Sequence, residues 1–371
     1  MSSTKETIQK LLETADIKIN ADRPWDIKVN DERFYGRVLT GGSLGLGESY
    51  MDGWWDCESV DEFFFHILKT ELSKKIQFNL SLILNFLRYR IFNLQNKNRA
   101  SEVAEHHYNL GNKLYSSFLD PYYQYSCGYF QETKELNRAQ EQKLDLICRK
   151  LQLKSGDRVL DIGCGWGGLA RYMAEHYKCS VVGINLSDEQ IKFAREFNKG
   201  FPVEILKMDY RDLEDKFDKI VSVGMFEHVG VKNYRKFFKI IKKCLKDDGL
   251  CLLHTIGSNH SVMSPDAWIT KYIFPNGFLP SVVQIGKGIN RILVLEDWHS
   301  FGQYYDETLV AWFKNFNDSW TLLRSDYNQR FYRMWTYYLL SCAGAFRARK
   351  IQLWQIVLSK DGIVGGYKSV R

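Results

Sequence analysis

Long apolar runs, paired cysteines and a strong excess of one charge are missing from this sequence. No stretch of the 371 residues approaches the roughly 18 uninterrupted apolar residues of a membrane span, and the opening MSSTKETIQK lacks the apolar segment of a signal peptide. The eight cysteines are scattered, with no CxxC pair and no Cys/His cluster at zinc spacing. These absences predict a reduced, cytosolic setting, no bound metal and, at most, peripheral contact with a membrane.

The charge balance also argues against nucleic acid as a partner. The net charge of +7 comes from 51 basic and 44 acidic residues, so the excess is mild, and no RNP, zinc-finger or Arg-rich element accompanies it. Aromatic residues, in contrast, make up 15% of the chain and gather in its last hundred residues, as in WITKYIFPNGF and FYRMWTYY. They indicate either a large apolar or cation-lined cavity or a well-filled core.

The first 95 residues differ in pattern from the rest. They open with an amphipathic helix carrying Ile8, Leu11 and Leu12, and continue through short strand-like and Gly-rich pieces such as LTGGSLGLG at 39–47. A helix at 76–94 has a broad apolar face, which predicts packing on its own domain, a subunit interface or insertion into a bilayer surface. We expect an N-terminal docking or dimer domain at 1–95, a polar linker at 96–103 and a catalytic domain at 104–371.

Strand and helix patterns alternate after residue 104, which predicts a doubly wound parallel sheet with crossover helices. Helices are expected at 169–177, 188–197 and 234–245, the last with one apolar and one cationic face. The expected strands are 158–162, 180–184, 203–208, 219–223, 250–255 and 351–358.

The segment RVLDIGCGWGG at 158–168 predicts a cofactor loop. Leu160 and Asp161 end a buried strand, and four glycines follow where a helix should begin, at Gly163, Gly165, Gly167 and Gly168. Glycine allows the sharp turn and lets a ligand approach the backbone. A GxGxxG spacing alone also fits dinucleotide enzymes or a plain tight turn. A strand that ends in Asp before this loop resembles the S-adenosylmethionine-dependent methyltransferases.

Polar residues follow the next strands at the edge where ligands bind in an open parallel sheet. The acid that would grip a ribose in dinucleotide enzymes is replaced by Asn185, with Gln190 one turn later, which disfavours NAD. Asp209 and Tyr210 can hold an adenine, although Asp209 can equally cap a helix. Glu227 and His254 follow the last two parallel strands and predict a polar catalytic cluster above the loop.

Eight motifs in order resemble the bacterial cyclopropane-fatty-acyl-phospholipid synthases. They cover essentially all of residues 104–371 and read EHHYNLGNKLYSSFLD, YSCGYF, LDIGCGWGG, MFEHVG, LLHTIGS, YIFPNGFLPS, EDWHSFGQYYDETL and CAGAFRARKIQLWQ. The resemblance implies a class I methyltransferase, a Rossmann-like doubly wound α/β sheet, with a smaller and mainly helical N-terminal domain. It also implies that the S-adenosylmethionine methyl carbon becomes a methylene across the cis double bond of a phospholipid acyl chain.

The resemblance further implies a carbocation intermediate that bound bicarbonate deprotonates so that the ring can close. The residues it places around the anion are Cys127, Glu227, His254, Ile256 and Tyr305. Around the cofactor it places Tyr125, Ser126, Leu160, Asp161, Gly163, Gly165, Gly167, Gly168, Asn185, Gln190, Asp209 and Tyr210. Aromatic rings able to stabilise the cation are Tyr305, Trp298, Tyr272 and Phe274.

The expected partner is a membrane phospholipid with unsaturated chains, reached by a cytoplasmic homodimer bound peripherally to the inner leaflet. Arg88, Arg90, Lys97 and Arg99 would contribute to that attachment. Three other functions stay open at this point. They are a related fatty-acyl methyltransferase with a methyl-branched product, a small-amine methyltransferase, and a catalytically silent lipid-binding protein.

Overall fold

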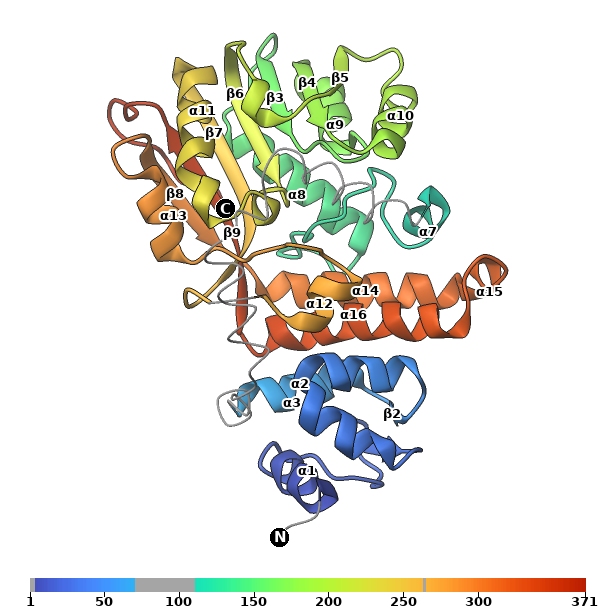
Figure 1. The fold of residues 1–371 in the computed structure, drawn as a ribbon. Helices are drawn as coiled ribbons and strands as arrows, with labels where there is room; N and C mark the ends of the chain where they lie inside the picture. Colours follow the sequence, from blue (N-terminus) through green and yellow to red (C-terminus); the bar gives the residue numbers. More distant parts are fainter. Residues whose placement is uncertain (1–3, 71–110, 263–264) are drawn as a thin grey trace. The chain divides into compact units, whose positions relative to one another are not determined.

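The computed structural model describes residues 4–70, 111–262 and 265–371 (Figure 1). The chain divides into two compact units. The first contains the described residues of Met1–Phe92, Met263–Pro275 and Tyr305–Ile351, and the second those of Asn93–Val262, Asn276–Tyr304 and Gln352–Arg371. The predicted helix at 76–94, the linker at 96–103 and the four basic residues expected to attach the protein to a membrane lie outside the described residues.

The second unit is built on a seven-stranded sheet in the order β5-β4-β3-β6-β7-β9-β8. The pairs β5/β4, β4/β3, β3/β6 and β6/β7 are parallel, and β9/β8 is antiparallel. Parallel neighbours bring their carboxyl ends to one edge, where the loops after β3, β4, β6 and β7 meet. The strands are β3 Arg158–Ile162, β4 Ser180–Asn185, β5 Val203–Lys207, β6 Phe217–Val223, β7 Leu245–Ser258, β8 Val294–Ser300 and β9 Ile351–Ser359.

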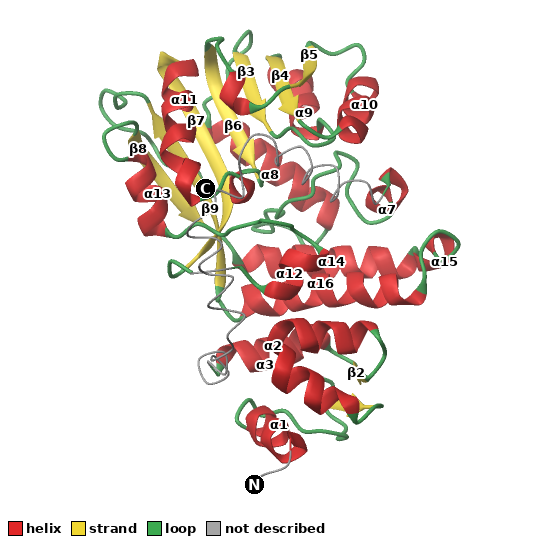
Figure 2. Ribbon diagram, in the orientation of Figure 1, coloured by secondary structure: helices red, strands yellow, loops and turns green. Residues whose placement is uncertain are grey.

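Helices cover both faces of this sheet, because successive strand residues point to opposite sides. Val159 packs with α8 and α9, whereas Leu160 and Ile162 pack with α11 and α13 (Figure 2). The helices are α7 Asn112–Ser116, α8 Leu136–Lys150, α9 Gly168–Tyr177, α10 Asp188–Phe197, α11 Tyr234–Cys244 and α13 Val282–Ile289, with short 3-10 turns η1 Tyr210–Asp212, η2 Phe226–His228 and η3 Val231–Asn233.

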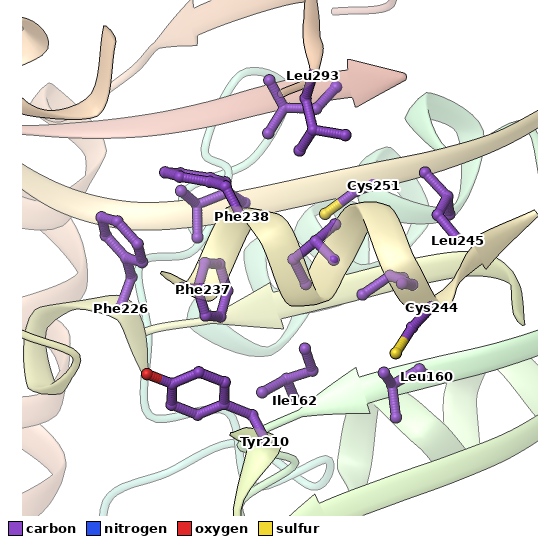
Figure 3. Close-up of a cluster of buried hydrophobic side chains, with 14 of the residues drawn as sticks. Leu160, Ile162, Tyr210, Phe226, Phe237, Phe238, Cys244, Leu245, Cys251 and Leu293 are labelled. Atoms are coloured by element: carbon purple, nitrogen blue, oxygen red, sulfur yellow. The ribbon is translucent and has the colours of Figure 1, made fainter. Parts of the chain in front are cut away.

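The core between the sheet and α11 is rich in aromatic rings. Phe226 stacks on Tyr234 with ring centroids 4.2 Å apart, and Phe237 and Phe238 meet it at 5.2 and 5.5 Å. Figure 3 shows these phenylalanines in one buried cluster with Cys251 of β7 and Leu160 of β3. The loop that carries the MFEH sequence is therefore held to the sheet by apolar packing.

The predicted fold class and all six predicted strands are confirmed, with two differences. The sheet has an additional strand, β8, which was not predicted, and the predicted strand at 351–358 pairs with it in antiparallel orientation. Trp298, predicted as a cation-stabilising ring, lies on β8 and packs at 5.1 Å against Trp354. The predicted helices at 169–177, 188–197 and 234–245 match α9, α10 and α11 to within a residue.

The first unit is mainly helical and draws on distant parts of the chain. A two-stranded antiparallel ribbon, β1 Ile27–Val29 with β2 Trp55–Cys57, accompanies the helices. The unit includes α14 only from Tyr305 onward, and its last segment ends at Ile351. The helices are α1 Thr4–Glu13, α2 Arg33–Met51, α3 Val60–Lys69, α12 Ala267–Tyr272, α14 Gln303–Asp318, α15 Trp320–Leu323 and α16 Gln329–Arg347.

The segment 39–47, expected among short strand-like and Gly-rich pieces, lies instead inside α2. Gly42 interrupts the helix with φ 54° and ψ −132°, a backbone conformation that residues other than glycine rarely adopt. A Cβ on Gly47 would lie 2.3 Å from the indole of Trp268, so the glycine makes room for that ring. Gly42 therefore allows the irregular turn inside α2, and Gly47 allows close packing. The predicted amphipathic helix near Ile8 is confirmed as α1.

Arg347 at the end of α16 ties three acidic side chains of the first unit together. Its guanidinium contacts Glu62 at 2.6 Å, Asp61 at 2.7 Å and Asp306 at 2.8 Å. Asp61 and Glu62 begin α3, where negative charge also suits the helix dipole. The arginine thus connects a helix of the first 70 residues with two helices of the last 70.

We predict that Arg347→Ala lowers the free energy of unfolding by about 2 kcal/mol, because several charge-assisted hydrogen bonds are lost from a half-buried site. Urea unfolding followed by tryptophan fluorescence measures the change. Arg324→Ala, at an exposed position of the same unit, is the matched control and should change stability little. Equal effects of the two substitutions would contradict the role of Arg347.

Candidate active site

The glycine loop after β3 adopts the geometry that its sequence predicts. Gly163, Gly165 and Gly167 have φ of 79°, 54° and 81°, and Gly167 caps the start of α9. A Cβ on Gly168 would lie 1.7 Å from the backbone oxygen of Tyr122, so only glycine fits there. Four glycine positions, three by their positive φ and one by lack of space, therefore shape this loop after β3.

Asp161, the last polar residue before the loop, is buried without full hydrogen bonding. Its side chain is 2% exposed, and Oδ2 has no hydrogen-bond partner among the described residues. Burial raises the pKa of Asp161 to about 7, against the opposing attraction of the Lys143 ammonium. An unpartnered carboxylate oxygen beside a glycine loop is suited to accept hydrogen bonds from a bound polar molecule.

Asn185 and Gln190 form a small amide network with the loop. Asn185 Nδ2 donates to Gln190 Oε1 at 2.9 Å and to the Gly165 oxygen at 3.2 Å, while Asn185 Oδ1 accepts from the amide of Leu186 at 2.7 Å. The structure therefore brings these two predicted residues to the glycine loop. Their predicted contact with a cofactor ribose stays a prediction.

Asp209 caps the 3-10 turn η1, which is the alternative role that the sequence allowed. Its Oδ1 accepts from the amide of Arg211 at 2.9 Å, and its Oδ2 lies 3.2 Å from the Arg211 guanidinium. The ring of Tyr210 is buried, with its centroid 5.3 Å from that of Phe237. Asp209 and Tyr210 thus have structural contacts of their own, and their cofactor role stays a prediction.

Glu227 is held on η2 at the carboxyl end of β6. It is 6% exposed, and its Oε1 accepts a 2.6 Å hydrogen bond from the amide of Ile256 on β7. Oε2 has no hydrogen-bond partner among the described residues. Burial raises the pKa of Glu227 to about 7, against the stabilising amide of Ile256. Glu227 and Ile256 therefore meet across β6 and β7, whereas the predicted convergence of Glu227 with His254 stays a prediction.

His254 precedes Ile256 by two residues and lies on the same side of β7. The ring is 1% exposed, and burial lowers its pKa well below the usual value, so the imidazole is neutral at physiological pH. Its Nδ1 lies 3.3 Å from Nε2 of Gln355 on β9. If that amide nitrogen donates, the imidazole proton is on Nε2, an atom with no partner among the described residues. His254 then offers one buried N–H to a ligand.

The YSCGYF segment is also buried, and a lysine anchors it. Lys143 Nζ donates to Ser126 Oγ at 2.8 Å and to Gln124 Oε1 at 2.6 Å. Cys127 Sγ donates to the Gly128 oxygen at 3.2 Å, and both Ser126 and Cys127 are buried. The half-buried ring of Tyr125 meets that of Tyr115 at 5.3 Å.

Lys143 was missed by the reasoning from sequence. It lies on α8 with 0% exposure, and burial lowers its pKa to about 8, against the attraction of Asp120, Cys127 and Asp161. The same ammonium contributes to lowering the pKa of His254. Its burial could have been predicted from its spacing, because Lys143 lies four residues after Ala139 and four before Ile147, on the buried face of α8. It links the residues near Asp161 with the YSCGYF segment.

Tyr305 belongs to the first unit, so its predicted place beside Glu227 and His254 stays a prediction. Its ring is buried on α14 and stacks on Phe346 with centroids 4.5 Å apart. Tyr272 of the same unit donates from its hydroxyl to Glu48 Oε1 at 2.8 Å. Phe274 packs at 5.9 Å against Tyr338.

The second unit therefore presents a glycine loop, a buried Asp161 and a pair of buried polar side chains after β6 and β7. Among the described residues, no group of His, Cys, Asp and Glu is arranged to hold a metal ion. The described helices include none that is long and apolar enough to cross a membrane. Fold and site define a class I S-adenosylmethionine-dependent methyltransferase.

Comparisons with known proteins specify the family. The model for mycolic acid cyclopropane synthetases matches residues 95–356. A cyclopropane-fatty-acyl-phospholipid synthase of Escherichia coli K12 is 54% identical over 362 residues, which cover 98% of this chain and 94% of the relative. The chain belongs to the mycolic acid cyclopropane synthetase family. The predicted resemblance and the predicted enzyme class are confirmed.

Two further relatives are more distant. A probable fatty acid methyltransferase of Pseudomonas putida is 38% identical over 277 residues, covering 71% of this chain and 70% of that protein. The crystal structure of the mycolic acid cyclopropane synthase CmaA1 with SAH and CTAB superposes with a TM-score of 0.66 at 30% identity, covering 70% of this chain and 98% of that one. Both similarities agree with the assignment to the S-adenosylmethionine-dependent methyltransferases.

We predict that Glu227→Gln changes the pH dependence of stability. Between pH 4.5 and about 7 the folded protein keeps a proton on Glu227 that the unfolded chain has released, so this group's contribution to stability falls as pH rises. The substitution removes this loss. The stability of the variant relative to the parent should rise by up to about 3 kcal/mol from about pH 5 to about pH 8.

Urea unfolding of both proteins at the two pH values measures this difference. Glu296→Gln, which makes the same chemical change on β8, is the control. A constant difference between the Glu227 variant and the parent protein across this range would show that Glu227 is not protonated in the folded state near neutral pH.

Proposed function

We propose that this protein is a cyclopropane-fatty-acyl-phospholipid synthase. It transfers a methylene from S-adenosylmethionine to the cis double bond of an unsaturated acyl chain in a phospholipid. The observation that carries the proposal is the pair of buried atoms Glu227 Oε2 and His254 Nε2, neither of which has a hydrogen-bond partner within the described ranges, in a chain 54% identical to the Escherichia coli synthase. Methyl transfer to a small amine requires no such pair, because it passes through no carbocation.

The residues of the second unit fit the methyl donor. The glycine loop leaves the backbone open to a close ligand, and Asp161 Oδ2 is an acceptor that needs a donor. Tyr125, Ser126, Leu160 and the glycines are proposed to surround the donor, with Asn185, Gln190, Asp209 and Tyr210 at its nucleoside end. When bound, S-adenosylmethionine supplies the electrophilic methyl carbon.

The pair Glu227 and His254 fits a small oxygen-rich anion. Neutral His254 offers an N–H, and Glu227 offers an oxygen that accepts when ionised and donates when protonated. When bound, bicarbonate supplies a base for removing the proton whose loss closes the ring. Burial of both side chains keeps water away, so the cationic intermediate is not hydrolysed.

Ile256 positions Glu227 through its amide, and its carbonyl is engaged by Thr255 Oγ1 at 3.1 Å. Cys127 and Tyr305 are proposed to complete the anion site. Cys127 is not proposed as a nucleophile, because the reaction has no acyl transfer and its intermediate is cationic. Further parts of the proposal are a homodimer and peripheral attachment to the inner leaflet of the cytoplasmic membrane.

Mass spectrometry of the acyl chains tests the reaction. Purified full-length protein is incubated with S-adenosylmethionine and vesicles that contain unsaturated phospholipid. We expect S-adenosylhomocysteine and a chain heavier by one CH2 that no longer reacts with ozone. A product that gains the carbon but keeps a double bond indicates the methyl-branching reaction, and no S-adenosylhomocysteine would contradict the enzyme assignment.

We predict that Glu227→Gln lowers kcat by roughly 10²-fold or more, the usual contribution of general-base machinery, while S-adenosylhomocysteine binding measured by calorimetry changes little. Glu296→Gln is again the control. In CO2-free buffer the parent protein should lose rate and recover it when bicarbonate is added. Full activity of the Glu227 variant, or a rate indifferent to bicarbonate, would remove the anion from the mechanism.

A further inference from the structure

A shallow depression of about 500 Å³ lies on the outer side of α11 in the second unit. Apart from Ile292, every residue that lines it is basic, and no acidic residue lines it. We call this surface the α11 basic face. Its cations are Lys216, Arg235, Lys239, Lys242, Lys243, Arg291 and Lys360.

The cations of the α11 basic face come from four separate segments of the chain. The sequence of α11, YRKFFKIIKKC, places its aromatic and aliphatic residues in the core and leaves its five basic residues outside, with no acid among them. Lys216 precedes β6, Arg291 follows α13, and Lys360 follows β9. A helix face exposed to water needs charged side chains, but they need not all be positive. The gathering of cations from four segments therefore calls for a separate explanation.

Few of these charges are neutralised within the protein. Lys242 pairs with Asp361 at 2.8 Å, and Lys360 pairs with Asp247 at 2.6 Å. In the part of the chain that the structure describes, no acidic side chain forms an ion pair with the other cations of the face. These are Lys216, Arg235, Lys239, Lys243 and Arg291. Mutual repulsion of these charges is relieved when an anionic surface covers them.

The shape of the face indicates an extended partner rather than a small molecule. Ligand pockets are concave and mostly apolar, with a few converging polar groups, whereas this depression is open and its cations are largely exposed. Nucleic acid is disfavoured because no aromatic ring lines the depression to stack on bases.

Exposed aliphatic side chains lie on the elements next to the α11 basic face. Val282 and Val283, at the start of α13, are 50% and 58% exposed, and α13 packs beside α11 (Figure 1). Leu295 of β8 is 46% exposed and lies four residues after Arg291. The second unit thus exposes both cations and aliphatic groups, the two kinds of side chain that bind the polar–apolar boundary of a bilayer.

We propose that the α11 basic face docks the second unit on a bilayer through anionic phospholipid head groups. The proposal rests on the proposed function, because a phospholipid substrate brings the protein to such a surface. It assigns docking to the unit that carries the glycine loop, in addition to the N-terminal region predicted from sequence. Each cation that meets an anionic surface strengthens binding roughly fivefold.

The test is a charge reversal in the full-length protein, Lys216→Glu with Lys239→Glu and Arg291→Glu. The matched control carries Lys154→Glu, Lys192→Glu and Lys199→Glu, which make the same change in net charge at exposed positions of the same unit. Lys192 lies on α10 and Lys199 just after it, on the connection from β4 to β5 at the opposite edge of the sheet. Sedimentation with phosphatidylcholine vesicles, with and without phosphatidylglycerol, measures binding.

The reversal should weaken binding to phosphatidylglycerol vesicles roughly 100-fold or more, while the control changes it far less. Both variants should turn over phospholipid in zwitterionic detergent micelles like the parent protein, which shows that they are folded. Three results would overturn the proposal. The reversal and control variants could bind vesicles equally, or inorganic phosphate could displace the parent protein from vesicles more than NaCl of equal ionic strength does. The third is that the reversal weakens binding to an oligonucleotide but not to vesicles. Vesicle binding that depends on the face without any lipid product would instead contradict the proposed function.

Discussion

Exclusion of water from the strand ends is the constraint on which the second unit depends. Helices cover both faces of its sheet, so the polar side chains at the carboxyl ends of β3, β6 and β7 lie in a low-dielectric environment. Burial raises the pKa of Asp161 and Glu227 and lowers that of His254. Burial thereby brings the pKa of both acids close to neutral and keeps His254 uncharged, and acids with such a pKa are suited to exchange protons near neutral pH.

Lys143 belongs to the same electrostatic arrangement. It is the buried cation that Asp161 and Cys127 face, and its hydrogen bonds to Gln124 and Ser126 hold the YSCGYF segment. Removing this ammonium would take a donor from Gln124 and Ser126 and would take from Asp161 the positive charge that favours its ionised form. The stability of this region and the protonation of its acids are therefore coupled.

Much of the second unit could be predicted from sequence, since apolar strands and a glycine loop are local patterns. The parts that could not are those where distant residues decide. Gln355, which orients His254, is 101 residues away from it, and the antiparallel β8/β9 pair depends on a strand that local alternation did not mark. Lys143 was missed because lysine is expected at the surface. The glycines of α2 did not indicate a helix, and the need for one of them, Gly47, becomes visible only in its packing against Trp268, more than two hundred residues away.

The three ion pairs of Arg347 have a consequence for how the chain folds during synthesis. Asp61 and Glu62 leave the ribosome almost three hundred residues before the arginine that neutralises them. The helices of the first 70 residues must wait, with apolar surface uncovered, while most of the sheet of the other unit is made. Chain termination shortly before α16 would leave these helices without their partner, so such truncated products should be recognised by chaperones and proteases rather than accumulate.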